Sequence, residues 1–452
     1  MNGKLAVAII WHMHQPYYKH PQTSEFVLPW VRLHASKDYL HMARLLNEFP
    51  KVKVNFTMVP SLRDQLEDYA RGADDEDTRV TMRTVEGTLT PEERDHMLAR
   101  FFSIHHGNVI ALHDEYRRLL QLALAARGRP ELLSDDYFVD LALWFNLAWI
   151  DPDDIAGDER LRDLRDRARR FTREDVHYVI GRQRFMASGA PHLYRSLERD
   201  DIGALVHPEQ LYQPFRLTNG VTALFRDREI SDRIGFAYGS MSPHDAVGDL
   251  IWKLEAARDR LPDDGGPYIA SIILDGENAW EAYPNNGNDF LRTLYGTLEA
   301  DERFETVRVS DFLDAHPAKV KLPALHTGSW IDGDLRVWSG EPAHQRAWHM
   351  LERTRRFAQE QWGSLREMPP SVRQPLMVAE GSDWFWWYSS RNSSPEDRVF
   401  DELFRANCEV IWWYAGAEPP DELKQPLLDP ARLDGAMREG GAMLPGKREG
   451  YG

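Results

Sequence analysis

Cysteine is almost absent from this chain, because Cys408 is the only one in 452 residues. An internal disulfide needs two thiols and a thiolate metal cluster needs several, so the sequence excludes both. A protein without disulfides suits a reducing compartment. We therefore expect a cytoplasmic location.

Basic side chains are fewer than acidic ones in this chain. The 55 Lys and Arg side chains are outnumbered by 72 Asp and Glu side chains, which gives a formal net charge of −17. Binding a phosphate backbone requires clustered Lys and Arg. This balance argues against nucleic acid as a partner.

A long hydrophobic run is missing near the start. Only seven apolar residues, Leu5 to Trp11, precede the polar His12. This run is too short for the core of a secretory signal or for a membrane-spanning helix, which needs about 20 apolar residues. We expect no membrane association, in agreement with a cytoplasmic location.

Aromatic side chains, by contrast, are abundant: the chain has 15 Trp, 16 Tyr and 19 Phe. Most of them are expected to fill the core, but their number exceeds what a core of this size needs. Flat rings commonly bind the faces of sugars. A carbohydrate ligand is therefore one use for the surplus.

The hydrophobic pattern indicates an α/β protein. Residues 5–11 are apolar throughout, as in a parallel strand that is buried on both faces. A helix with Ser36 as its N-cap is expected to connect this strand to a second strand at 52–60, which completes a βαβ unit. The order of strand, polar residues and helix returns at 268–274.

The chain is mostly helical from about 90 to 187, and we interpret this stretch as an insertion between strands of a barrel. Thr90 and Glu93 form a capping-box pattern for one helix. Thr172 and Asp175 form a similar pattern for another.

Composition also predicts the domain limits. We expect a barrel domain at 1–317 that includes the insertion, a helical domain at 318–430, and a disordered tail at 431–452. The stretch HPAKVKLP marks the first boundary, and the tail has six glycines with little periodicity.

A polar motif, HMHQP, follows the first predicted strand. It places His12, His14 and Gln15 at the carboxyl end of a strand, where barrel and open α/β enzymes gather their catalytic groups. The imidazoles could donate hydrogen bonds to sugar hydroxyls or bind a divalent metal ion. A histidine can also be a packing residue, so the sequence leaves these uses open.

Two carboxylates, Asp275 and Glu277, come directly after the strand at 268–274. Cleavage of a glycoside needs one protonated carboxyl group for the leaving oxygen, and an aromatic setting near Trp280 and Tyr283 could raise its pKa. Alternatively, Asp275 could cap the helix that follows. The sequence does not rank the two carboxylates.

Two further segments are candidates for substrate binding. The segment RDRE, which contains Asp227, follows another apolar strand and could bind hydroxyl groups or form a structural ion-pair network. Asp383 precedes five consecutive aromatic residues, Trp384 to Tyr388. Neighbouring side chains point in different directions, so some of these rings could line a cleft while others seat the helical domain.

Together these motifs resemble conserved segments of family-57 glycoside hydrolases. HMHQP near the start, ILDGENAWE after a late strand and AEGSDWFWWY in the C-terminal part follow the order of that family. The amylopullulanase-like or α-amylase-like branch is the most similar. Supporting segments extend the resemblance to about residue 414: LYQPFRL, LFRDREISDRIGF, PNNGNDFLRTLY and LHTGSWIDGD.

The resemblance implies an incomplete (β/α)7 barrel followed by a helical domain. It also implies retaining chemistry without a metal or cofactor, acting on α-glucans or maltooligosaccharides with α-1,4 or α-1,6 links. Asp275 would be the general acid/base, and His14 would contact the sugar at the point of cleavage. The other residues expected to bind substrate or shape the cleft are His12, Asp227, Glu277, Trp280, Asp383 and Trp384.

The sequence departs from the family in one large respect. Between the helical region and LYQPFRL, the family has a Pro-Tyr-x-His-Pro-type motif and a Trp-Pro-Ser-Glu-type motif whose Glu is the nucleophile, and neither stands there in this chain. Glu198 lies in a charged run, and Glu209 lies in a stretch whose family counterpart is not the nucleophile. The nucleophile is therefore unassigned.

The sequence leaves three functions open. The first is a hydrolase or transglycosylase acting on α-glucan. The second is a carbohydrate-binding relative that performs no cleavage, which the missing motif would explain. The third is a metal-dependent hydrolase in which His12 and His14, with Asp275 or Glu277, bind zinc or manganese.

Overall fold

The computed structural model describes residues 4–194, 211–262, 266–322, 327–329, 331, 334–429 and 432. Contacts within the chain divide it into two compact units. The first unit contains residues 1–14, 31–71 and 83–326. The second unit contains residues 15–30, 72–82 and 327–452.

A parallel sheet forms the core of the first unit. β1 (Leu5–Met13) pairs on one side with β5 (Ile269–Asp275). On its other side, β1 pairs with β6 (Phe304–Thr306) along its first half and with β2 (Asn55–Met58) along its second half. Within the described residues this sheet stays open and does not close into a barrel.

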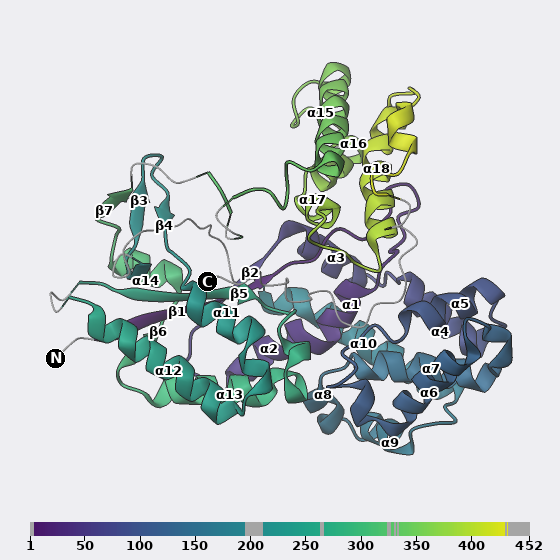
Figure 1. Cartoon of the computed structure of the whole chain (residues 1–452), viewed down its shortest axis with the longest axis horizontal. Coiled ribbons are helices and arrows are strands. Elements are labelled where there is room, and N and C mark those ends of the chain that lie inside the picture. Colours follow the sequence, from purple (N-terminus) through teal and green to yellow (C-terminus); the bar gives the residue numbers. More distant parts are fainter. Residues whose placement is uncertain are drawn as a thin grey trace. The chain divides into compact units, whose positions relative to one another are not determined.

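A smaller sheet in the same unit has three short strands, with β3 in the middle (Figure 1). β3 pairs antiparallel with β4 and parallel with β7. The strands are β3 (Phe215–Leu217), β4 (Thr222–Ala223) and β7 (Val320–Leu322).

The central strands are buried on both faces. Val7, Ala8 and Ile9 of β1 are 0% exposed, and so is Ile272 of β5. A continuous apolar run of this kind is typical of a parallel strand that is covered by helices on both faces. Burying one such branched side chain stabilises the fold by about 1.5–3 kcal/mol. The strands predicted from the sequence at 5–11, 52–60 and 268–274 are confirmed.

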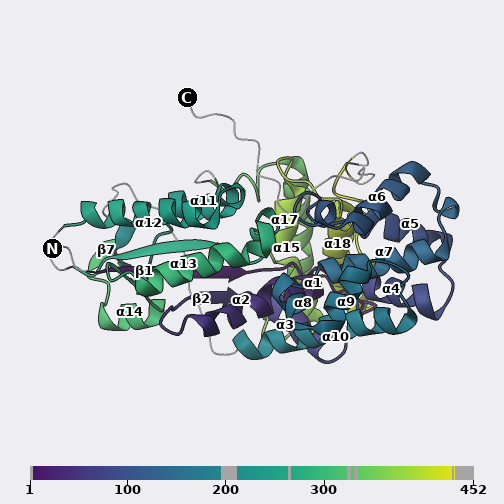
Figure 2. The same cartoon turned by 90° about the horizontal axis from the view of Figure 1, so that it is seen from below.

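Some helices of the first unit lie beside the sheet, and others form a separate group. Figures 1 and 2 show α12 and α13 beside β1 and β5, and α5, α6, α7 and α9 gathered at the other end of the unit. The α-helices are α1 (Trp30–His34), α2 (Leu40–Leu45), α3 (Pro60–Ala70), α5 (Pro91–Arg100), α6 (Asp114–Ala126), α7 (Asp135–Ala148), α8 (Pro152–Gly157), α9 (Glu159–Arg167), α10 (Arg173–Tyr194), α11 (Arg228–Phe236), α12 (Pro243–Arg260), α13 (Asn288–Ala300) and α14 (Val309–Ala315). A π-helix, η1 (Ala35–Tyr39), joins α1 to α2, and the short 3-10 turns are η2 (Leu46–Glu48), η3 (Ile110–Leu112), η4 (Pro130–Leu132), η6 (Tyr238–Ser240), η7 (Trp280–Ala282) and η8 (Pro284–Gly287).

The predicted helix starts in the insertion are confirmed. Thr90 and Glu93 make both hydrogen bonds of a capping box at the start of α5. At the start of α10, the backbone N–H of Thr172 donates to Asp175, and the backbone N–H of Asp175 donates to the Thr172 hydroxyl.

The predicted N-cap at Ser36 is wrong. Ser36 lies inside η1, within a helical stretch that begins at Trp30. Its hydroxyl donates to carbonyl groups of the preceding turn, those of Arg32 and Leu33, each at 3.0 Å. Serine can make this bond within a helix as well as at a cap, so its presence alone does not mark a start.

The second unit is helical in its described part. Trp384 and Phe385 of α17 are buried in its core together with Phe404 of α18. The predicted limits 1–317 and 318–430 stay a prediction, and the predicted tail at 431–452 lies outside the described residues apart from Arg432. The helices are α4 (Glu76–Glu86), which continues into residues of the first unit, α15 (Pro342–Trp362), α16 (Pro370–Ala379), α17 (Asp383–Tyr388), α18 (Asp397–Tyr414) and the turn η9 (Asp421–Lys424).

None of the helices in the described ranges is long and apolar enough to cross a membrane.

Candidate active site

Three polar side chains stand in one row where the central strands end. His12 of β1 is the register partner of Thr57 in β2 and of Asp275 in β5. Register partners in a sheet point to the same face, and the carboxyl edge of a parallel sheet is where α/β enzymes place their chemistry. With the residues that follow, this row forms what we name the strand-end cluster: His12, His14, Thr57, Asp275 and Glu277.

His12 is held between two neighbours. Its Nδ1 lies 2.7 Å from Oγ1 of Thr57, and its Nε2 lies 3.3 Å from Nδ1 of His14. Both ring nitrogens of His12 therefore contact protein groups. His12 thus orients the ring of His14, and both histidines are half-buried.

Asp275 ends β5 and is half-buried. The amide of Asn278 donates to its Oδ2 at 3.3 Å. The next position requires glycine, because a Cβ at Gly276 would lie only 2.2 Å from Sδ of Met13. The backbone N–H of Gly276 donates to the carbonyl of His12 at 2.8 Å. This close approach keeps Asp275 beside His12.

Glu277 differs from Asp275 in exposure and in partners. It is 1% exposed, and its Oε1 accepts hydrogen bonds from the backbone N–H of His14 and from the hydroxyl of Tyr39, each at 3.1 Å. Asp275 is not a helix cap, because the next helical turn, η7, begins at Trp280. The geometry therefore separates the two carboxylates: Glu277 holds the loop after β1, and Asp275 stays half-buried with a single side-chain hydrogen bond among the described residues, from Asn278.

Trp280 lies beneath the loop that carries these carboxylates. It is 1% exposed, its ring packs edge-on against Trp11 at 5.5 Å, and its Nε1 donates to the carbonyl of Gly276 at 2.6 Å. Gly287, at φ +74°, leaves room for the ring, since a Cβ there would lie 2.5 Å from it. A buried ring offers no face to a sugar, so we now propose that Trp280 shapes the site only through packing.

Asp227 is engaged by protein groups. It is the N-cap of α11, where it accepts from the backbone N–H of Ile230 at 3.1 Å, and it accepts from the hydroxyl of Tyr212 at 2.7 Å. Burial, followed by the charge of Asp227, raises the pKa of Tyr212, which keeps that hydroxyl protonated. Arg226 pairs with Asp232 at 2.8 Å. These contacts fit the structural alternative for this segment, and Asp227 as a substrate contact stays a prediction.

Asp383 and Trp384 belong to the second unit, as does Gln15. Asp383 is half-buried in the first turn of α17. Trp384 is 1% exposed, and its Nε1 donates to the carbonyl of Val378 at 2.8 Å. Its ring therefore belongs to the core of that unit, and its role in shaping a cleft stays a prediction.

Two members of the site were not foreseen from the sequence. Thr57 could have been found, because it lies at the carboxyl end of the second predicted strand. Tyr39 reaches Glu277 across 238 positions of sequence, so no local pattern indicates the contact. Glu198 and Glu209, the two glutamates considered for the nucleophile, lie outside the described residues.

The metal-binding alternative at His12 and His14 is not supported by geometry. Among the described residues, the group of three that is close enough to hold a metal is His41 with Asp151 and Asp153, and the two strand-end histidines are not part of it. They contact each other instead.

The fold is similar to those of solved structures. A GH57 branching enzyme from Thermococcus kodakaraensis superposes with a TM-score of 0.51 at 13% identity, over 94% of this chain and 93% of that chain. An α-amylase from Thermotoga maritima gives a TM-score of 0.48 at 14% identity, over 94% and 96%. At such low identity, the similarity to the branching enzyme shows the fold alone. No curated protein matches the chain in sequence.

The sequence also matches a protein family directly. The match is to Glycosyl hydrolase family 57 and spans residues 8–153 and 190–324, which is more than half of the chain. Every member of the strand-end cluster lies within it. The α/β fold class of the (β/α)7 type is confirmed by this match and by the fold of the branching enzyme, with the sheet open in the described residues. The chain therefore belongs to glycosyl hydrolase family 57.

Proposed function

We propose that this protein acts on α-glucans, by hydrolysis or by transfer of a glucan chain, at the strand-end cluster. The observation that carries the proposal is the register of the central sheet, which sets Asp275 directly beside His12 at the carboxyl edge. The family match and the branching enzyme with a similar fold support α-glucan as the substrate class.

In this proposal Asp275 is the general acid/base. Its carboxyl group gives a proton to the glycosidic oxygen as the bond to the anomeric carbon breaks. The resulting carboxylate then takes a proton from water, or from the hydroxyl of an acceptor sugar, as the oxygen of that molecule forms the new bond to the anomeric carbon. Its half-buried position suits both steps, because the group must reach substrate and also exchange protons.

His14 is proposed to contact the sugar, with His12 and Glu277 as positioning residues. Glu277 holds the backbone N–H of His14, and His12 holds its ring. Fixing both the backbone and the ring limits the motion of His14, and such positioning supports catalysis because small displacements cost rate.

Glucan binding without cleavage is the second candidate function. One observation favours it: the family's Trp-Pro-Ser-Glu-type motif, which carries the nucleophile, is missing from the sequence. A retaining mechanism requires two carboxyl groups about 5 Å apart. A protein that keeps Asp275 and loses the nucleophile would bind substrate and leave it intact.

The test compares turnover with binding. The purified protein is incubated with maltoheptaose, amylose or pullulan, and both reducing ends and longer transfer products are measured. Binding of maltoheptaose is measured by calorimetry. For an enzyme, Asp275→Asn should lower turnover about 10²–10⁴-fold with binding changed little. Asp289→Asn, at an exposed position of α13, is the matched control and should retain full turnover.

The outcomes separate the two candidates. Products that disappear in Asp275→Asn support the enzyme, and binding without products supports the non-cleaving protein. The absence of both binding and products with every α-glucan contradicts both proposals. Products that persist in Asp275→Asn contradict the role of Asp275.

A further inference from the structure

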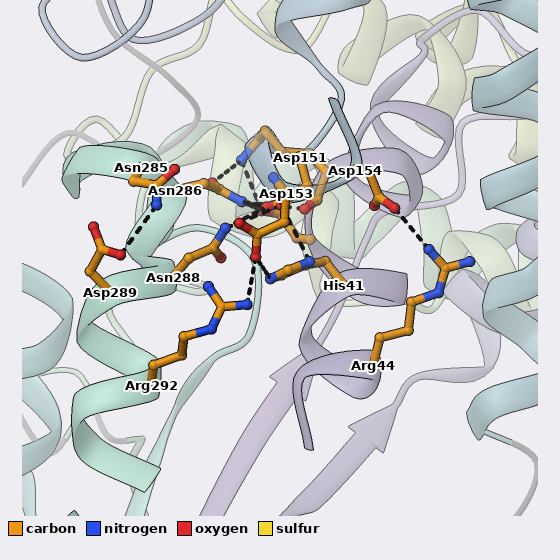
Figure 3. A network of polar contacts seen from close by, with 12 residues as sticks. His41, Arg44, Asp151, Asp153, Asp154, Asn285, Asn286, Asn288, Asp289 and Arg292 are labelled. Carbon is orange, nitrogen blue, oxygen red and sulfur yellow. Dashed lines mark hydrogen bonds and ion pairs between the residues drawn. The ribbon is translucent and has the colours of Figure 1, made fainter. Parts of the chain in front are cut away.

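A second polar cluster is formed by residues of α2, α8 and α13 (Figure 3). His41 comes from α2, Asp151 and Asp153 from the start of α8, and Asn288 from the start of α13. Single ligand atoms of His41, Asp151 and Asp153 all lie within 4.8 Å of one another. We name these four residues the helix cluster.

Asp151 is the anchor of the helix cluster. It is 0% exposed and accepts from the backbone N–H of Asp153 at 2.8 Å and from the amides of Asn286 and Asn288 at 2.9 and 3.1 Å. Its Oδ1 also lies 3.2 Å from Nδ1 of His41. One buried carboxylate thus fixes the orientation of both the imidazole and the amide of Asn288.

In the part of the chain that the structure describes, two buried acceptor atoms of the helix cluster remain without a hydrogen bond. Nε2 of His41 and Oδ1 of Asn288 have no hydrogen-bond partner among the described residues, although the side chains are only 6% and 0% exposed. Burying a polar atom without a partner costs about 1–3 kcal/mol. Figure 3 shows the Asn288 side chain directed toward Asp151, Asp153 and His41.

The separation of the donor atoms suits a single ion. Nε2 of His41 lies 3.6 Å from Oδ2 of Asp153, which is too long for a hydrogen bond. Two atoms that each bind one zinc ion at about 2.1 Å lie roughly 3–4 Å apart. A cation placed between them would satisfy both atoms.

The charges of the surroundings leave room for a divalent cation. Arg292 pairs with Glu48 at 2.8 Å and with Asp153 at 2.7 Å. With His41 neutral, the carboxylates of Glu48, Asp151 and Asp153 exceed the single guanidinium by two negative charges. The nearby Asp38 and Asp154 have cations of their own, Lys37 and Arg44 respectively.

We propose that His41, Asp153 and Asn288 bind one divalent cation, with Asp151 and Arg292 as the outer groups that orient the ligands. A ligand set of imidazole, carboxylate and amide oxygen suits Zn²⁺ or Mn²⁺. A ligating histidine usually donates its other ring N–H to a carboxylate, and Nδ1 of His41 lies 3.2 Å from Oδ1 of Asp151. The ion would join α2, α8 and α13 and so fasten the helical insertion. This departs from the expectation of a metal-free protein that the family resemblance implied.

The first test measures binding and stability in the wild-type protein. Protein freed of metal with a chelator is titrated with ZnCl₂ and with MnCl₂ by calorimetry, and thermal melting is followed with and without each ion. We expect one ion per chain and a higher Tm in its presence. No binding of either ion, or binding that leaves Tm unchanged, overturns the proposal.

The second test assigns the ligands. His41→Gln and Asp153→Asn should each weaken the binding of the preferred ion tenfold or more, and Asp289→Asn, on α13 but outside the ligand set, should bind as the wild type does. Wild-type affinity in both ligand variants overturns the proposal.

A spectroscopic measurement guards against variants that fail to fold. Co²⁺ bound to wild-type protein should give a visible absorption band typical of nitrogen and oxygen ligands, and ZnCl₂ should remove the band by displacing Co²⁺ from the same site. The absence of a visible band with Co²⁺, or a band that ZnCl₂ does not remove, overturns the proposal.

Discussion

The first unit contains two clusters in which histidine meets carboxylate, and they hold their histidines differently. In the strand-end cluster, His12 contacts a hydroxyl and a second histidine, and the nearby Asp275 is half-buried. In the helix cluster, His41 contacts Asp151, which is 0% exposed and accepts hydrogen bonds from three other groups. Histidine and aspartate therefore form a partly exposed pair of residues in one cluster and a buried pair in the other.

The difference in burial between Asp151 and Asp275 distinguishes a structural carboxylate from one that can react. Burial raises the pKa of Asp151 to about 6, although His41 and the two asparagines oppose the shift. Burying a carboxylate is unfavourable, so the hydrogen bonds that Asp151 accepts are needed to stabilise it. Asp275 has one long side-chain hydrogen bond, from Asn278, and is available to a ligand.

Removal of the anchor carboxylate should give the largest effect. Asp151→Ala leaves His41, Asn286 and Asn288 without their shared acceptor, and loss of a buried charged partner costs about 3–5 kcal/mol. Asp275→Ala should change the free energy of unfolding by only about 0.5 kcal/mol, as expected for a partly exposed side chain. Urea unfolding of the two variants checks the contrast. Equal losses of stability would remove the distinction between the clusters.

Crowding at the strand ends should give the next largest effect. Gly276→Ala places a Cβ 2.2 Å from Sδ of Met13, and such overpacking costs about 1–3 kcal/mol. Gly248→Ala in α12 is the matched control, because a Cβ there meets nothing within 4 Å. Removing a glycine from a helix should stabilise it by about 0.5–1 kcal/mol. Thermal melting that moves in the same direction for both variants would contradict this explanation.

The region beside the helix cluster should also be sensitive to acid. Burial would raise the pKa of Asp38, but the charge of Lys37 and the hydrogen bond from His34 outweigh it, so this pKa is lowered. A lowered pKa means that Asp38 contributes stability above its ordinary value of about 3.8, and that this contribution is lost as the pH falls below it. Urea unfolding from pH 7 to pH 3 measures the loss, which should be smaller in Asp38→Asn. An equal slope in that variant would assign the acid loss to other groups.

The strand-end cluster could be predicted in part, because local patterns encode it. The apolar runs of β1 and β5 end directly at His12 and Asp275, and parallel strands bring their carboxyl ends to one edge. The roles of the two carboxylates could not be ranked in advance. Glu277 is buried by contacts with His14 and Tyr39, which lie far from it in sequence.

The helix cluster could not be predicted from the sequence at all. His41, Asp151 and Asn288 lie on three helices that are more than 100 positions apart along the chain. No motif with metal-ligand spacing connects them, so only the packing of α2 against α8 and α13 brings them together. The open sheet of the described residues could not be predicted either, because the number of paired strands depends on tertiary contacts.

The smallest expected effect concerns the orientation of His12 in the strand-end cluster. Thr57→Val keeps the shape of the side chain and removes the oxygen that lies 2.7 Å from Nδ1 of His12. One neutral hydrogen bond contributes about 0.5–1.5 kcal/mol, so glucan turnover, or glucan affinity in a non-cleaving protein, should fall by roughly fivefold. Thr57→Ser retains the hydroxyl and should behave as the wild type does. If Thr57→Val instead lowers the melting temperature and leaves glucan turnover and affinity unchanged, Thr57 supports packing and does not orient His12. The strand-end cluster would then resemble the helix cluster more closely than its exposure suggests.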